Sequence, residues 1–138
     1  MAKSYPVSVR LNADALEHAR QISRQSERSI GQVLSTLVEE GVRMRRCPGI
    51  LFTDGPTGRR ATVGGAGVDV WEVVRTARTC TNRRQIARAF PRLTAGQIDA
   101  ALTYYDCYPD EIDRRIEENE GSFATLQRRS PFIKKVRA

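Results

Sequence analysis

The stretch Tyr5-Pro6-Val7-Ser8-Val9-Arg10-Leu11 decides how the first part of this chain folds. Apolar Val7, Val9 and Leu11 occupy every second position, which is the pattern of a strand with one buried face. No second strand pattern follows within the first 47 residues. The backbone groups and the apolar face of the strand must nevertheless find partners. We therefore expect a second copy of the chain to pair with it, in a two-stranded antiparallel ribbon over a shared helical core.

Two helices are predicted directly after this segment. Asn12 fits the N-cap of the first helix, which runs to about Gln25, and Ser29 fits the N-cap of the second. Apolar residues recur at helical spacing over residues 30–42. Cys47-Pro48-Gly49 then ends the second helix.

A strand, a helix, a turn and a second helix within residues 3–46 resemble the ribbon-helix-helix family of DNA-binding dimers, the Arc, MetJ and CopG class. The resemblance implies a swapped homodimer whose ribbon enters the major groove of double-stranded operator DNA. The core of that dimer is expected to consist of inward-facing strand residues and apolar residues of the second helix. These are Val7, Val9, Leu11, Ile30, Leu34 and Leu37.

The same resemblance assigns base reading to the outward-facing residues of the strand, which here match Pro6, Ser8 and Arg10. Arg10 can donate two hydrogen bonds to guanine O6 and N7, and the Ser8 hydroxyl can donate or accept one. Pro6 departs from the polar residue that is usual at its position. It has no N–H and no polar side chain, so it can at most contact a thymine methyl group.

The resemblance also implies phosphate contacts at the start of the second helix. The free N–H groups of Ile30 and Gly31, aided by the Ser29 hydroxyl, can hold a phosphate. Arg28 lies beside them in the sequence, and Lys3 is a further candidate for a contact with the DNA backbone. In the alternative interpretation, Ser29 only caps its helix.

A short hairpin and a glycine-rich joint are predicted over residues 48–68. Ile50-Leu51-Phe52 and Ala61-Thr62-Val63 flank the turn signal Asp54-Gly55-Pro56-Thr57-Gly58. The glycines of Gly64-Gly65-Ala66-Gly67 lack the spacing of a nucleotide-binding loop. We expect them to form a flexible joint.

A bundle of short helices is predicted over residues 69–120. The helices are expected over Val68–Thr79, around Ile86, from the capping box Thr94-Ala95-Gly96-Gln97, and from Pro109. The turn before the third of them makes the module similar to a helix-turn-helix. That third helix carries no Arg or Lys, so we expect the bundle to bind protein or support the dimer rather than read DNA.

Five motifs occur in order within residues 48–118. They are Gly58-Arg59-Arg60-Ala61, Asp69-Val70-Trp71-Glu72-Val73-Val74, Leu93-Thr94-Ala95-Gly96-Gln97-Ile98, Ala100-Ala101-Leu102-Thr103-Tyr104-Tyr105 and Glu111-Ile112-Asp113. Together they are similar to the domain-of-unknown-function family 433, which is common in bacterial antitoxins of the VapB type. This resemblance implies a protein toxin as partner, usually a PIN-like ribonuclease with an acidic metal site.

Positive charge is concentrated at the two ends of the chain. The 138 residues carry 23 Lys and Arg against 16 Asp and Glu, a net charge of +7. Residues 1–47 hold +3, residues 48–68 hold +1, residues 69–120 hold −2 and residues 121–138 hold +5. This balance favours an anionic partner, either nucleic acid or a protein with an acidic site.

The basic tail, residues 121–138, starts at Gly121-Ser122, which we expect to break or weaken the preceding helix. Three roles stay open for it: a disordered tail, an added contact with DNA phosphates, and a segment that folds onto the toxin. In the last case Phe132 and Ile133 would be apolar anchors, and cations would neutralise carboxylates of the nuclease. The toxin-binding candidates are Arg128, Arg129, Phe132, Lys134, Lys135 and Arg137.

The residues offer little material for catalysis. His18 is the only histidine and is expected at the surface. Cys47, Cys80 and Cys107 are odd in number and form no C-x-x-C pair, which indicates a reducing cytoplasm. The acidic residues between positions 106 and 118 are expected to form a solvated helix face. We expect no enzyme activity, no metal and no cofactor.

No signal peptide and no run of 18 apolar residues is present, so we expect a soluble cytoplasmic protein without a membrane partner. The predicted fold is mainly α with minor β structure. The predicted function is that of a type II antitoxin, which binds operator DNA to repress its own operon and neutralises a PIN-like ribonuclease toxin by direct binding. Two alternatives stay open. One is a repressor with a C-terminal ligand-sensing or interaction domain, and the other is a toxin-binding dimer without specific DNA binding.

Overall fold

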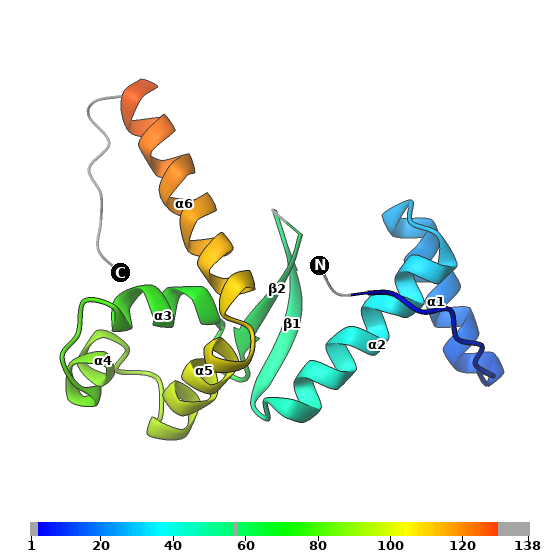
Figure 1. Ribbon diagram of the computed structural model, residues 1–138, viewed down its shortest axis with the longest axis horizontal. Helices are drawn as coiled ribbons and strands as arrows, with labels where there is room; N and C mark the ends of the chain where they lie inside the picture. Colours follow the sequence, from blue (N-terminus) through cyan, green and yellow to red (C-terminus); the bar gives the residue numbers. More distant parts are fainter. Residues whose placement is uncertain (1–2, 57, 130–138) are drawn as a thin grey trace. The chain divides into compact units, whose positions relative to one another are not determined.

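The computed structural model describes residues 3–56 and 58–129, with side chains described as far as residue 121. Its elements are α1 (Ala13–Ser26), α2 (Ile30–Arg46), β1 (Ile50–Gly55), β2 (Gly58–Val63), β3 (Val68–Asp69), α3 (Val70–Ala77), α4 (Arg83–Ala89), α5 (Ala95–Cys107) and α6 (Pro109–Arg129), as Figure 1 shows. The predicted class, mainly α with minor β structure, is confirmed. The chain divides into two compact units, residues 1–42 and 43–138.

In the first unit the predicted N-caps are present. The Asn12 side chain accepts a hydrogen bond from the backbone N–H of Ala15 at 2.8 Å, and α1 begins there. Glu27 follows the last residue of α1 with φ at 56°, a left-handed conformation that ends the helix and starts the turn into α2. Of the apolar side chains described in this unit, Ala19 and Val33 alone are buried. The two helices therefore share a very small core.

The strand predicted over residues 5–11 is not formed in the single chain. Residues 3–12 have no regular secondary structure, and Val7 and Val9 are exposed. The downstream hairpin does not supply a partner, because β1 pairs with β2, and β2 pairs with β3. The ribbon between two chains stays a prediction, since it requires a second copy.

The second unit contains a three-stranded antiparallel sheet in the order β1-β2-β3. Ile50 pairs with Val63 at one end of the predicted hairpin, which is confirmed. The short strand β3 was expected as the start of a helix, and it pairs with the end of β2. The glycine segment after β2 is a hydrogen-bonded turn rather than a free joint, because the Ala66 N–H donates to the carbonyl oxygen of Val63 at 3.2 Å. The Gly64 N–H also donates to the carbonyl oxygen of Gly49 at 2.8 Å, which ties the turn to the residue before β1.

Helix α3 lies at the centre of the second unit and packs against β2, β3, α4, α5 and α6. Its Val70 and Val73 are fully buried. One hydrophobic core joins the sheet to the helices. Its members are Cys47, Ile50, Ala61, Val63, Val70, Val73, Val74, Ile86, Leu93, Ile98, Ala101, Tyr104, Ile112 and Ile116. The hairpin and the helical bundle are therefore parts of one folded body.

A side-chain cap starts α5 where the sequence predicts it. Gln97 N–H donates to Thr94 Oγ1 at 3.1 Å, and Thr94 N–H donates to Gln97 Oε1 at 2.8 Å, which is the predicted capping box of α5. Helix α6 begins at Pro109 as expected. It continues through Gly121 to Arg129, so the expected break is wrong. One glycine costs a helix only about 1 kcal/mol, which its neighbours offset.

The buried Tyr104 anchors a polar cluster at the edge of the core, with half-buried Arg43 and Glu111. Its hydroxyl donates to Glu111 Oε2 at 2.5 Å. Arg43 Nη1 donates to the Tyr104 oxygen at 3.3 Å and to Glu111 Oε1 at 3.1 Å. The cluster therefore joins the last turn of α2 to α5 and α6. The expectation that all acidic residues of this region face solvent is wrong for Glu111, and also for Asp113, which accepts from Tyr105 at 2.8 Å.

Burial and the hydrogen bond to Glu111 raise the pKa of the Tyr104 phenol well above its ordinary value of 10.0. The folded state thus favours the neutral phenol more than the unfolded state does. The stabilisation is complete below the pKa of the unfolded chain, and it is lost as the pH rises above that value.

We predict that the free energy of unfolding falls as the pH rises above about 10 in the wild type and falls less in Tyr104→Phe. Near pH 7 the substitution should cost about 1–3 kcal/mol, because Glu111 loses a buried donor. Urea denaturation followed by circular dichroism measures both effects. All other groups that titrate in this range are shared by the two proteins, so the difference isolates Tyr104. Identical pH dependence in the two would contradict this role.

Candidate nucleic-acid interface

The first unit leaves most of its large apolar side chains exposed. Val7 is 80% exposed, Val9 is 64% exposed and Leu37 is 44% exposed. Monomeric proteins rarely expose apolar surface on this scale unless it binds something. The full set, here called the apolar surface, is Tyr5, Val7, Val9, Leu11, Ile22, Ile30, Leu37, Val38 and Val42.

The residues predicted for the dimer core belong almost entirely to this apolar surface. Val7, Val9, Leu11, Ile30 and Leu37 are exposed in the single chain, and Leu34 is half-buried. These are side chains that α1 and α2 fail to cover by themselves. A second copy would cover them by the pairing that the alternating pattern predicts, and the dimer itself stays a prediction.

The outward-facing residues expected to read bases are accessible. Pro6, Ser8 and Arg10 are exposed, as is Lys3. Because every residue from position 3 to position 11 is exposed, the single chain does not yet separate an inward face from an outward one. Pairing with another strand would create that separation.

At the start of α2, Ser29 and Gln32 form a reciprocal cap. Gln32 N–H donates to Ser29 Oγ, and Ser29 N–H donates to Gln32 Oε1, both at 3.1 Å. The Ser29 oxygen is therefore engaged within its own helix, as the capping interpretation requires. Across the two described ranges of the chain, no hydrogen bond engages the N–H groups of Ile30 and Gly31, which can still hold a phosphate.

Arg28 turns away from this cap. Its Nη2 donates to Thr36 Oγ1 at 2.9 Å and to the carbonyl oxygen of Gln32 at 3.4 Å. The guanidinium therefore lies along α2 and not beside Ile30. Both bonds are exposed, so water can replace them at little cost if Arg28 moves to a phosphate.

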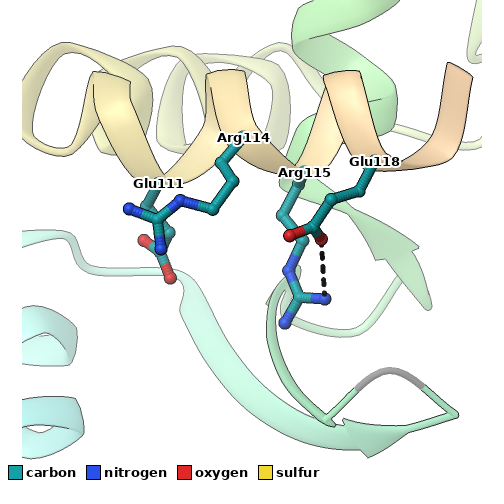
Figure 2. Close-up of a pocket in the computed structure, with 4 residues that line it drawn as sticks. All are labelled: Glu111, Arg114, Arg115 and Glu118. Carbon is teal, nitrogen blue, oxygen red and sulfur yellow. Dashed lines mark ion pairs between the residues drawn. The ribbon is translucent and has the colours of Figure 1, made fainter. Parts of the chain in front are cut away.

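The second unit carries two open pockets that share Arg115. The first has a volume of about 240 Å³ and lies along one side of α6, where Arg115 Nη1 is 3.9 Å from Glu118 Oε2 (Figure 2). Its lining consists of charged side chains only: Glu111, Arg114, Arg115 and Glu118. The second, of about 230 Å³, is lined by Pro56, Arg60, Asp69, Trp71, Arg115 and Asn119. Ligand pockets are typically about 300–1,000 Å³, so both of these are small for a small-molecule sensor, and the charged lining of the first is also unlike the largely apolar lining of such pockets.

The remaining findings concern His18, metal ligands and membrane-spanning helices. His18 lies at the surface, where its Nδ1 is 3.5 Å from Asp14 Oδ1. In the part of the chain with described side chains, no group of three or more His, Cys, Asp or Glu is placed to hold a metal ion. Within residues 3–56 and 58–129, no helix combines the length and apolarity that crossing a membrane requires.

Most of the proposed toxin contacts lie outside the described residues. This holds for Phe132, Ile133, Lys134, Lys135 and Arg137. Arg128 and Arg129 are the last two residues of α6, and their side chains are also outside the description.

Two groups of residues were not predicted from the sequence. One is the cluster of Arg43, Tyr104 and Glu111, whose members have no local pattern in common. The other is a run of arginines around α4, from Arg75 to Arg92, which was hidden by averaging the charge over residues 69–120. Counting charge in shorter windows would have found it.

The fold of the second unit is thus a small three-stranded antiparallel sheet packed against α3 and α5, with α4 and α6 packed on these two helices. Residues 50–105 match the model of the family described as protein of unknown function, DUF433, so the chain carries a DUF433 domain there. The match covers β1 through most of α5 and ends before Glu111-Ile112-Asp113, so it is shorter than the expected range. No curated protein and no solved structure matches the chain. The comparisons thus support neither a ribbon-helix-helix family nor a VapB antitoxin.

We predict that Leu37→Asp and Val9→Asp prevent dimerisation, because each would bury an unpaired charge in the apolar surface. The dissociation constant of the dimer should rise roughly 100-fold or more, as measured by sedimentation equilibrium. Ser35→Asp is the matched control, since Ser35 is an exposed polar residue of the same helix. A wild-type protein that sediments as a monomer at micromolar concentration would reject the proposed interface.

Proposed function

We propose that the chain is a dimeric operator-binding antitoxin. Its N-terminal units would pair as a ribbon-helix-helix and repress the operon, and its second unit would bind and neutralise a ribonuclease toxin. The main support for the proposed dimer is the exposed apolar surface around Val7, Val9 and Leu37. The unit to which it belongs buries only two apolar side chains among its described residues. The proposal that a toxin is the partner rests on the resemblance of the second unit to domains found in VapB antitoxins.

A second copy of the chain is the partner that best suits this surface. The strand segment needs hydrogen bonds for its backbone as well as cover for its apolar face. An identical segment running antiparallel supplies both at once, and its two-fold symmetry makes the contact close on itself. Val7, Val9 and Leu11 of the two copies would then lie on one side of the ribbon, over α2.

DNA binding would follow from the other side of that ribbon. Residues 3–12 carry Lys3 and Arg10 and no acidic residue, so two copies present four positive charges. A two-stranded ribbon fits the major groove, where Arg10 can pair with guanine and Ser8 with either partner of a base pair. The N–H groups of Ile30 and Gly31 would fix the position of the ribbon on the phosphates.

One alternative has specific support. Pro6 removes a polar group from the first reading position, which favours a toxin-binding dimer without specific DNA binding. A repressor that senses a small ligand finds no such support, because both of the pockets described are small and one is lined by charged side chains only.

The DNA proposal is tested with Arg10→Ala and the DNA upstream of the protein's own gene. We expect the variant to remain dimeric and to lose about 1–3 kcal/mol of discrimination against random competitor DNA, as Arg10 reads a base. Fluorescence anisotropy at fixed salt measures this loss. Arg20→Ala removes the same charge from an exposed position on α1 and should keep full discrimination. Unchanged discrimination in Arg10→Ala would remove this role, and a wild type that shows no preference would favour the alternative.

The toxin proposal is tested by co-expression with the product of the adjacent gene. We expect the two proteins to co-purify and the full-length chain to restore growth. Deletion of residues 128–138 should weaken inhibition of the ribonuclease roughly tenfold or more, as it removes cations and apolar anchors. Undiminished inhibition by the shortened chain would reject the tail as the neutralising segment.

A further inference from the structure

Six arginines and no acidic residue lie between Glu72 and Asp99. They are Arg75, Arg78, Arg83, Arg84, Arg88 and Arg92. This run surrounds α4, and its charge of +6 is cancelled in the average over residues 69–120 only by acids elsewhere in the sequence. The partners of each arginine decide which of these charges are available to a ligand.

Three of the six arginines have partners inside the fold. Arg78 pairs with Asp113 and donates to the Tyr105 hydroxyl at 3.3 Å. Arg83 pairs with Asp99, and the Arg75 guanidinium lies 4.9 Å from the centre of the Trp71 ring. The other three differ from these. In the described part of the chain, Arg84, Arg88 and Arg92 are exposed and engage in no ion pair or hydrogen bond.

The helix holds two of the free arginines on one face. Arg84 and Arg88 are four positions apart, and each is two positions from Ile86. At 3.6 residues per turn they lie on the side of α4 opposite to Ile86, which is buried in the core. Arg92 follows in the turn that leads to α5.

The backbone that carries these arginines is well anchored. The Asn82 side chain caps α4 by accepting from Gln85 N–H at 3.0 Å, and Thr81 N–H donates to Gln85 Oε1 at 2.8 Å. Helix α4 packs against α3 and α5, at the edge of the second unit (Figure 1). The three cations are thus presented on a fixed support that faces solvent.

The composition of this surface fits phosphates better than a protein. The cores of protein interfaces are rich in aromatic and apolar anchors and poor in charge. The large exposed apolar side chains of the described residues all lie between Tyr5 and Leu51, and none lies on or beside α4. Interfaces with DNA are strongly positive, and the planar guanidinium group matches the oxygens of a phosphate. The adjacent helix α5 carries no Arg or Lys to read bases.

We propose that Arg84, Arg88 and Arg92 of the DUF433 domain form a second DNA contact, which holds backbone phosphates of duplex DNA without reading sequence. The contact is separate from the ribbon and does not depend on it. It gives the second unit a role on DNA beyond any contact with a toxin. Each chain would neutralise up to three phosphates at this surface.

The test uses the full-length chain and a fluorescein-labelled 30-base-pair duplex of random sequence, titrated by anisotropy between 50 and 300 mM KCl. Binding releases about 0.9 counterions for each phosphate that is neutralised. Log K falls as log[KCl] rises, so the slope is negative. The triple variant Arg84→Ala, Arg88→Ala, Arg92→Ala should therefore make this slope less steep, by up to about 3 per chain. Its affinity at the lowest salt should fall roughly tenfold or more.

Two matched variants separate this contact from other effects. The triple variant Arg20→Ala, Arg45→Ala, Arg114→Ala removes the same charge from other exposed positions and should leave most of the slope intact. Replacement of Arg84, Arg88 and Arg92 by lysine keeps the charge and should also preserve the slope. Thermal unfolding monitors whether each variant remains folded.

An unchanged slope in the α4 variant would overturn the proposal, as would an equal fall in the control variant, which would indicate net charge alone. Labelled poly-L-glutamate is the probe for an acidic protein. Loss of its binding in the α4 variant, with the DNA slope unchanged, would reassign the surface to a protein partner. The operator experiment with Arg10→Ala tests the ribbon separately, so either idea can fail without the other.

Discussion

The backbone of a strand cannot be left without hydrogen-bond partners once its apolar face is buried, and the N-terminal part of this protein is arranged around that constraint. The segment around Val7 and Val9 has the pattern of a half-buried strand, yet nothing in the described chain pairs with it. Helices α1 and α2 cannot compensate, since their shared core is so small. The unit is therefore incomplete by itself. In the proposed dimer another identical unit would complete it, and the polar face of the ribbon would then be presented to DNA.

The second unit holds its elements together within a single chain. Its apolar core admits one polar cluster, in which Tyr104, Glu111 and Arg43 satisfy one another. A network that ties a buried phenol to half-buried charged groups favours one arrangement, because a shift would leave the Tyr104 hydroxyl without its partner. The ring of Tyr108, 4.9 Å from that of Tyr104, lies under the guanidinium of Arg43 and continues the cluster to the surface. The end of α2 is held in this way without large apolar side chains.

Local rules made part of the fold predictable. Asn12, Ser29 and Thr94 cap their helices as their positions indicate, because a cap depends only on residues three positions away. The two-residue strand β3 was missed, since so short a strand has no period. The contact between Arg43 and Glu111 joins residues 68 positions apart and left no trace in local spacing. At the candidate site, exposure of the strand residues could be predicted, whereas the direction of Arg28 depends on Thr36 and could not.

The position of α6 within the core has a consequence for biosynthesis. Ile112 and Ile116 are the last described residues of the core, while Ile50 is among the first. Helix α6 packs on α3 and α5, so a ribosome must release nearly the whole second unit before this core is complete. The N-terminal helices and their uncovered strand segment emerge much earlier, and domains generally fold in the order in which they are made. If the first units pair as proposed, two nascent chains on one transcript would associate through them while their second units are still being translated.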